Sequence, residues 1–350
     1  MQLSNLWTAS ALGIGNNQVW GNYLAGIAPG MRAIDGDIPG RSIWFGTVPA
    51  ERDEKLIRTN QLLKMAYEGM GGAIEALKRK YGKDRVAIVL GASNTGIDEA
   101  ENHVDEWLDQ GEKPEKLTFD MIELGTPSVY LKQLAGLEGP AYTVSTACSS
   151  ATKAFASAKR LIERGIADAA VTGGVDGRCR FAMNGFHALG ALSEGRCRPL
   201  AEDRDGINLG EGVALWTMET DEGEVELAGT GESSDAYHAT APDPEGLGAE
   251  MAMRAAIAEA GGKEQIDYIN LHGTGTVAND AMEMKAVRRV FGENLPKYES
   301  TKNLTGHCLG AAGAVEAAIC HLRIANGLSK CCLSSSFAFG GSNAAVVLRA

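Results

Sequence analysis

One segment restricts the fold of this 350-residue chain more than any other feature. In it, a predicted strand is followed directly by a predicted helix, with a cysteine at the junction. The residues before Cys148 are apolar and β-branched and begin after Gly139-Pro140, which is typical of a buried strand. The Ala-, Lys- and Arg-rich run after it ends at Gly165 and predicts a helix. Cys148 is then at a helix N-terminus, where unpaired N–H groups favour an anion and bias a thiol toward thiolate. A small buried cysteine fits the same pattern, so this segment alone leaves both interpretations open.

The rest of the chain repeats this alternation of buried strands and amphipathic helices. Such alternation predicts an α/β fold with a largely parallel sheet that helices cover on both faces. We expect two halves, residues 1–220 and 221–350, integrated in one domain. We expect helices near 20–26, 58–80, 128–137, 150–162 and 249–260, strands at 85–90, 169–174, 213–216, 224–230, 266–271, 332–336 and 344–348, a weak opening strand at 3–10, and a charged surface excursion at 100–120.

Composition limits the possible partners and the compartment. The formal net charge of −12 disfavours non-specific binding to nucleic acid or to an anionic membrane, and an acidic partner would need a local basic patch. The seven cysteines form no CxxC pair and no metal-like spacing with histidine, so we expect reduced thiols, no metal ion and no cofactor. No secretion signal or membrane-spanning apolar run is evident, and we expect a cytoplasmic protein.

Two histidines occupy positions where ligands bind in open α/β sheets. His272 follows a buried strand, and His307 begins a Gly- and Ala-rich helix, whose N-terminus keeps an imidazole neutral. Each histidine taken alone is more often structural. One cysteine with two histidines suits acyl-thioester chemistry, in which the thiol accepts an acyl group and the imidazoles donate to a thioester carbonyl. Gly340-Gly341 would let a backbone N–H approach the same acyl group.

Four ordered blocks resemble the signatures of β-ketoacyl-acyl carrier protein synthases, the elongating condensing enzymes with a thiolase-like fold. The blocks are 143–149, 272–276, 302–313 and 337–343, and supporting matches cover most of the chain. The resemblance implies two pseudo-repeated α/β/α halves in five αβαβα layers. It also implies an acyltransferase that condenses malonyl-carrier protein with a cysteine-bound acyl group in fatty acid, polyketide or aryl polyene biosynthesis.

The resemblance also assigns expected roles to individual residues. Cys148 is the implied nucleophile, and His272 and His307 are the implied pair that promotes decarboxylation, with Lys302 beside them. The implied oxyanion hole comprises the N–H groups of Cys148 and Phe339. The remaining implied residues are Phe339 and Phe337 as the acyl gate, Glu316, Asp280, Glu283, Thr274 and Thr276 in support, and Arg198 and Arg58 as contacts for the acyl carrier protein.

Departures from the family pattern concern the pocket floor and the dimer surface. The separation of His307 from Phe339 is short, the usual Pro-rich loop between them is missing, and Ala338 replaces the usual glycine. The loop 241–246 resembles that of aryl polyene condensing enzymes. We expect a homodimer, or a heterodimer with a ketosynthase paralogue. Two alternatives are a non-catalytic chain-length partner subunit, which typically lacks the cysteine, and a degradative thiolase, which uses one histidine and a second cysteine.

Overall fold

One hydrogen-bonded sheet runs through the computed structural model, which describes residues 1–221 and 223–350. Its strand order is β12-β11-β13-β14-β10-β1-β9-β7-β5-β6, and the short β2 pairs with β1. The strands are β1 (Gln2–Ser10), β2 (Gly13–Ile14), β5 (Val86–Gly91), β6 (Ala141–Val144), β7 (Ala169–Asp176), β9 (Gly212–Glu219), β10 (Val225–Ser234), β11 (Tyr268–Asn270), β12 (Lys297–Glu299), β13 (Cys331–Ala338) and β14 (Ser342–Arg349).

The pairing pattern of the first five large strands is repeated by the last five. In the first set, β5 is parallel to β6 and β7, β7 is antiparallel to β9, and β9 is antiparallel to β1. In the second set, β11 is parallel to β12 and β13, β13 is antiparallel to β14, and β14 is antiparallel to β10. The antiparallel pair β1–β10 joins the two sets. The expected α/β, thiolase-like fold with two repeated units is confirmed. The expected largely parallel sheet is wrong, because β1, β9, β10 and β14 at its centre pair in the antiparallel direction.

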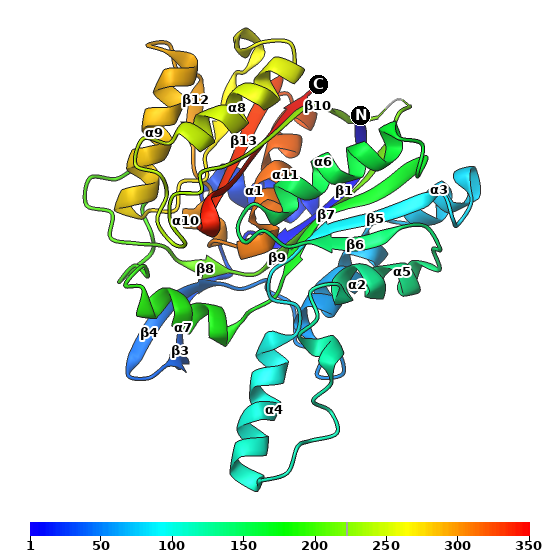
Figure 1. Ribbon diagram of the computed structural model, residues 1–350, viewed down its shortest axis with the longest axis vertical. Coiled ribbons are helices and arrows are strands. Elements are labelled where there is room, and N and C mark those ends of the chain that lie inside the picture. The colour runs from blue at the N-terminus through cyan, green and yellow to red at the C-terminus, as the bar shows by residue number, and fades with distance from the viewer. Residues whose placement is uncertain (222) are drawn as a thin grey trace.

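Helices cover both sets of strands and fill the space between them (Figure 1). α6 and α11 lie at the centre, α2, α3 and α5 cover the first set, and α8 and α9 cover the second. The helices are α1 (Asn16–Ala25), α2 (Arg58–Gly69), α3 (Ala73–Tyr81), α4 (Ile97–Gln110), α5 (Thr126–Ala135), α6 (Ser150–Glu163), α7 (Arg180–Ala188), α8 (Leu247–Glu259), α9 (Val277–Phe291), α10 (Lys302–Thr305) and α11 (Ala312–Ala325), with 3₁₀ turns at Phe119–Met121, Lys263–Gln265, Leu309–Ala311 and Phe339–Gly341.

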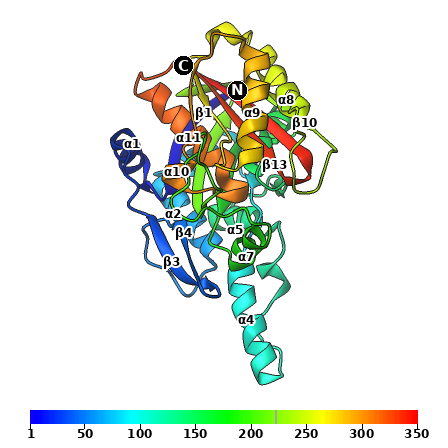
Figure 2. The same cartoon turned by 90° about the vertical axis from the view of Figure 1, so that its left-hand side faces the viewer.

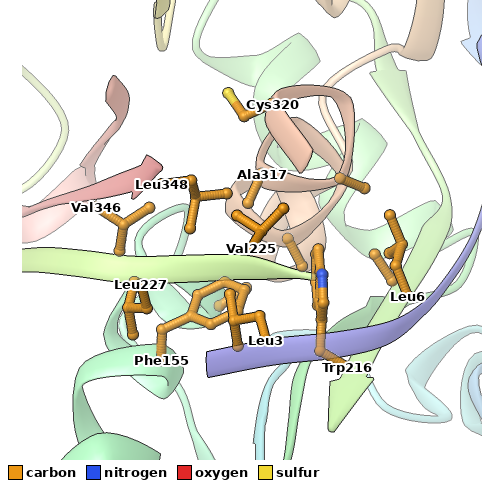
Figure 3. Packing of buried hydrophobic residues seen from close by; sticks show 14 of the residues in the cluster. Leu3, Leu6, Phe155, Trp216, Val225, Leu227, Ala317, Cys320, Val346 and Leu348 are labelled. Atoms are coloured by element: carbon orange, nitrogen blue, oxygen red, sulfur yellow. The ribbon is translucent and has the colours of Figure 1, made fainter. Parts of the chain in front are cut away.

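The central core brings side chains from both repeats together. Figure 3 shows Phe155 of α6 and Trp216 of β9 beside Leu3, with Ala317 of α11 close to Val225. Phe155 and Trp216 meet edge to face, with ring centroids 5.1 Å apart. The two central helices approach closely at Gly313, where an added Cβ would lie 2.0 Å from the side-chain oxygen of Thr152. The small residues of α11 therefore let the segments that precede α6 and α11, which carry Cys148 and His307, lie near each other.

Two additions lie outside the repeated core. A three-stranded sheet comprises β3 (Met31–Ile38), β4 (Arg41–Gly46) and β8 (Leu209–Gly210). α4 extends away from the body in both views (Figures 1 and 2). This arm exposes apolar side chains at Trp107, Leu108 and Phe119.

Several local expectations differ from the structure. The predicted helix 58–80 is two helices, because Gly71 and Gly72 adopt positive φ angles of 60° and 86° between them. The excursion at 100–120 contains α4, and the weak opening strand is the nine-residue β1, paired on both sides. All seven cysteines are buried free thiols. Among residues 1–221 and 223–350, no helix is long and apolar enough to span a membrane.

Candidate active site

The turn between β6 and α6 places Cys148 at the floor of a buried cavity. Ala147 adopts a positive φ of 52°, an uncommon conformation for a residue with a side chain, and its carbonyl accepts the N–H of Ser150, where α6 begins. The backbone N–H groups of Cys148 and Phe339 lie near the Cys148 sulfur, where they lower the pKa of the thiol. These are the two groups expected to form an oxyanion hole.

The expectation that Cys148 is biased toward thiolate is wrong for the resting protein. Burial raises the pKa of the Cys148 thiol to about 12, and the charge of Lys302 with the two N–H groups offsets only part of this effect. The helix N-terminus is present, but other segments bury the sulfur. Cys148 therefore needs a base to become a nucleophile.

His307 lies beside this sulfur, with Nε2 2.9 Å from Sγ. Its backbone is fixed on both sides, because its N–H donates to the carbonyl of Asn208 and its carbonyl accepts the N–H of Gly210. Burial and the charge of Lys302 lower the pKa of His307 well below its usual range, so the ring is neutral. Within residues 1–221 and 223–350, its buried Nδ1 has no hydrogen-bond partner. Either tautomer of His307 is therefore compatible with its surroundings.

His272 faces His307 and is held in one tautomer. The two ring centroids lie 5.3 Å apart, with nearly perpendicular planes. The Lys302 ammonium donates to His272 Nδ1 at 3.3 Å and to the His272 carbonyl at 2.5 Å, and it also pairs with Glu316. Because Nδ1 accepts, the ring proton is on Nε2. Burial and the charge of Lys302 lower the pKa of His272 well below its usual range.

Buried carboxylates position the loop after β11. Glu283 accepts the N–H groups of His272 and Gly273, at 2.8 and 2.7 Å, and burial raises its pKa to about 7. Asp280 accepts the N–H groups of Gly275 and Leu200. The structure therefore brings both expected supporting carboxylates to the backbone of this loop rather than to the imidazole. The Lys302 partner Glu316 is also buried, and burial raises its pKa to about 7 against the opposing effect of Lys302.

A cavity of about 230 Å³ opens above the cysteine and the two histidines. Thr274 and Thr276 line it, and their hydroxyl oxygens lie 2.9 Å apart. Phe339 is 37% exposed and stacks on Phe186 of α7, with ring centroids 5.4 Å apart, so it stands at the cavity mouth. Phe337 is buried against the His272 ring and lines the cavity, so its role in the acyl gate stays a prediction.

The cavity also contains three side chains of metal-ligating types, those of Cys148, His272 and His307. Their donor atoms all lie within 4.8 Å of one another, and thiolate and imidazole are common zinc ligands. The Lys302 ammonium contacts His272 directly and adds positive charge beside this set. That charge opposes a bound cation but favours an oxyanion or a carboxylate in the cavity.

Sequence reasoning missed two residues that shape the site. Phe186 lies in α7 with no local motif around it, so only its contact with Phe339 reveals a role. Asp176, at the end of β7, accepts the N–H groups of Ser93, Asn94 and Gly310. This carboxylate therefore ties the loop after β5 to the turn that follows His307. In the sequence, the only indication of this role is that Asp176 is an acidic residue at the end of a predicted strand.

The expectation that Arg58 contacts a carrier protein is wrong. Its side chain is buried, 4% exposed, and donates to both carboxylate oxygens of Glu211. A residue enclosed in this way cannot form a docking surface. Arg198 is exposed and pairs with Asp203 at the surface, so its docking role stays a prediction.

Replacing Arg58 by Met should lower the free energy of unfolding by about 3–5 kcal/mol, because the buried Glu211 carboxylate loses its cation. Urea denaturation measures this change. Lys64→Met, at an exposed ion pair in the same helix, is the control and should change stability by less than about 1 kcal/mol. Equal midpoints for Arg58→Met and the wild type would contradict a structural ion pair.

Comparisons with known proteins identify the family. Residues 49–223 match the model of the β-ketoacyl synthase N-terminal domain, and residues 225–334 match that of the β-ketoacyl synthase C-terminal domain. The chain belongs to the β-ketoacyl synthase family. It is 36% identical over 261 residues to 3-oxoacyl-[acyl-carrier-protein] synthase 2 of Staphylococcus aureus, and 37% identical over 256 residues to nodulation protein E of Rhizobium meliloti. These alignments cover 69% and 70% of this chain but only 64% and 63% of the two relatives.

Solved structures of ketosynthases have the same fold over nearly the whole chain. The complex of the ketosynthase ApeO with its chain length factor ApeC from Xenorhabdus doucetiae is similar with a TM-score of 0.94 and 37% identity. That alignment covers 99% of this synthase-family chain and 97% of the other. The ishigamide ketosynthase/chain length factor is similar with a TM-score of 0.91 and 27% identity, covering 99% and 98%.

Proposed function

We propose that this chain is a β-ketoacyl synthase that condenses malonyl-carrier protein with an acyl group held on Cys148, releasing carbon dioxide. The observation that carries the proposal is the meeting of one thiol and two neutral imidazoles in a single buried cavity. The S. aureus relative is a 3-oxoacyl-[acyl-carrier-protein] synthase, which supports an acyl carrier protein as the donor. The pathway is fatty acid, polyketide or aryl polyene biosynthesis.

Acyl transfer uses the contact between Cys148 and His307. With its proton on Nδ1, His307 accepts the thiol proton through Nε2 as the sulfur attacks the incoming thioester. In this proposal the N–H groups of Cys148 and Phe339, which lie near the sulfur, stabilise the carbonyl oxygen as it becomes negative. The proton then passes to the departing carrier thiolate.

Decarboxylation uses both imidazoles as donors. When the malonyl group loses carbon dioxide, the electron pair moves toward the thioester oxygen, which accepts Nε2–H bonds from His272 and His307. Lys302 fixes the required tautomer of His272, whereas the unpartnered Nδ1 of His307 lets that ring adopt the second tautomer for this step. The enolate carbon then attacks the acyl thioester, and the Cys148 thiolate leaves.

Incubation with acyl- and malonyl-carrier protein, followed by mass spectrometry of the carrier-bound product, tests the proposal. A β-ketoacyl product two carbons longer than the acyl primer is expected. The non-catalytic chain-length subunit remains the alternative, and it predicts no product from the purified chain. The intact Cys148–His307 contact favours catalysis over that alternative.

Lys302→Met should lower malonyl decarboxylation about 100-fold at pH 8, because no ammonium then donates to His272 Nδ1, so the ring proton can move to Nδ1 and leave Nε2 without one. Removing the cation also raises the pKa of His272, since Lys302 lowers it in the wild type. As the pH falls, the His272 ring of the variant takes up a second proton and again has a hydrogen on Nε2. The ratio of the variant rate to the wild-type rate should therefore rise toward pH 6. Carbon dioxide release between pH 6 and 9 measures this ratio. A ratio that is independent of pH would refute the positioning role.

The proposal includes a dimer, formed with a second copy or with a ketosynthase paralogue. β6 is the last strand in the sheet order, and the side chains of its four residues are half-buried. Elsewhere on the surface, α4 and the 3₁₀ turn at Phe119–Met121 expose Trp107, Leu108 and Phe119. An unpaired strand edge and exposed apolar side chains are both suited to contacts with another subunit. The division into residues 1–220, with the cysteine, and 221–350, with both histidines, stays part of the proposal, as does a cytoplasmic location.

A further inference from the structure

A serine hydroxyl connects residues 146–150, the turn that carries the nucleophile, with residues 337–343, the turn that carries Phe339. Ser149 directly follows the nucleophile and is fully buried, and its Oγ lies 2.9 Å from Oγ of Ser342. Ser342 begins β14, directly after the 3₁₀ turn that contains Phe339. In the part of the chain that the structure describes, this is the only hydrogen bond between side chains that joins the two turns. We call this contact the Ser149–Ser342 link.

The hydroxyl of Ser149 is not used in the way that is usual at its position. Ser149 is the N-cap residue of α6, where a serine commonly accepts an N–H of the first helical turn, but its side chain makes no such cap. Instead, its Oγ lies 2.9 Å from the Thr146 carbonyl oxygen, from Thr146 Oγ1 and from Ser342 Oγ. The Thr146 carbonyl alone would satisfy a buried hydroxyl. Burial therefore does not explain the contact with Ser342.

Each of the two turns is otherwise held by contacts on its own side. In the first turn, Oγ of Ser150 accepts the N–H of Thr146 at 2.9 Å. In the second turn, the backbone of Gly340 and Gly341 is hydrogen-bonded to the loop 235–239. Both glycines have positive φ angles, 78° and 76°, and neither has a side chain that could fix the turn by packing. None of these contacts crosses between the turns, so the Ser149–Ser342 link acts directly on their separation.

The two turns carry the two N–H groups that form the oxyanion hole in the proposed function. These groups belong to Cys148 and Phe339, and both lie near the Cys148 sulfur. Ser149 is the next residue after Cys148, and Ser342 lies three positions after Phe339. An oxyanion is stabilised fully only when both donors lie about 3 Å from the oxygen at the same time. A change in the separation of the turns would therefore weaken this stabilisation.

We propose that the Ser149–Ser342 link sets the relative position of the two N–H groups of the oxyanion hole, so that both serines are positioning residues for acyl transfer. This inference rests on the proposed function. Neither serine is among the described residues that line the catalytic cavity, so the link acts on the substrate only through the two backbone N–H groups. Decarboxylation uses the N–H groups of His272 and His307 instead. The link therefore supports acylation of the cysteine and not loss of carbon dioxide.

Acylation and decarboxylation, measured on the same variants, test this role. Ser149→Ala and Ser342→Ala should each lower kcat for acylation by a small acyl-N-acetylcysteamine thioester about tenfold, with KM unchanged, because one donor is misaligned but still present. The double variant should also lose about tenfold rather than about a hundredfold, because both serines act through one contact. Carbon dioxide release from malonyl-carrier protein should stay within about twofold of the wild-type rate in all three variants.

Two further variants separate this role from general damage to the site. Ser342→Thr keeps a hydroxyl at the same position and should acylate within about twofold of the wild-type rate. Ser336→Ala is the matched control, because Oγ of the buried Ser336 lies 2.8 Å from Oγ1 of Thr152 in α6. That contact also joins α6 to the strand before the Phe339 turn, but it involves neither of the two turns. Ser336→Ala should therefore leave the ratio of acylation to decarboxylation unchanged.

The possible results separate the link from the proposed function. Acylation at the wild-type rate in both Ser149→Ala and Ser342→Ala would overturn the link and leave the synthase activity standing. An equal fall in decarboxylation would also overturn it, because the damage would then extend to the whole site. A hundredfold loss in the double variant would show that the serines act separately and not through one contact. A wild type that accepts no acyl group removes the proposed function itself.

Discussion

Cys148→Ala is expected to abolish acyl transfer and condensation, with a loss of more than about 10⁴-fold in rate, because Cys148 is the only thiol that lines the catalytic cavity within residues 1–221 and 223–350. The same variant should still release carbon dioxide from malonyl-carrier protein, since both imidazoles and the Lys302 contact remain. Condensation and decarboxylation measured on one preparation separate the two steps.

The other cysteines provide a matched control. Cys331 is buried at the start of β13 and does not line the cavity, so Cys331→Ala removes a sulfur of similar burial without touching the site. It should retain condensation within about threefold. Residual condensation by Cys148→Ala at the level of Cys331→Ala would show that the acyl group is not carried by Cys148.

His307→Ala should lower malonyl decarboxylation by about 10²–10³-fold, because the developing enolate oxygen loses one of two donors in a buried site. The comparison is made in the Cys148→Ala background, where the role of His307 as a base for the thiol no longer contributes. Release of labelled carbon dioxide from malonyl-carrier protein measures the step.

A histidine outside the cavity is the control for His307. His103 lies in α4 and contacts Glu106 at the surface, so His103→Ala should release carbon dioxide at the rate of the Cys148→Ala parent. A double variant lacking Cys148 and His307 that matches this rate would exclude His307 as a donor. His272→Ala should cause a loss similar to that of His307→Ala, because each ring supplies one N–H.

The arrangement of the site could be predicted where local patterns and repeat topology determine it. Cys148 follows a recognisable strand and precedes a recognisable helix, and the structure places it between β6 and α6. His272 follows β11, which occupies in the second repeat the position of β5 in the first. β6 is parallel to β5, so Cys148 and His272 both follow the carboxyl ends of parallel strands, where ligands bind in α/β sheets.

Features that depend on contacts between residues far apart in the chain could not be predicted from the sequence. Arg58 looks like a surface cation because its burial results from Glu211, which lies 153 positions later in the chain. The raised pKa of Cys148 has the same kind of cause, since local helix geometry predicts a lower value and burial by other segments reverses it. Phe186 has no sequence signal because its role depends on stacking on Phe339, which joins α7 to a turn far away in the sequence.

The most direct measurement is the intact mass of the protein after incubation with an acyl-carrier thioester, followed by peptide mapping of the modified residue. One acyl group per chain, attached to Cys148, is the expected result. An unmodified chain, or an acyl group attached to one of the other six cysteines, would contradict the assignment of Cys148 as the acyl-accepting nucleophile.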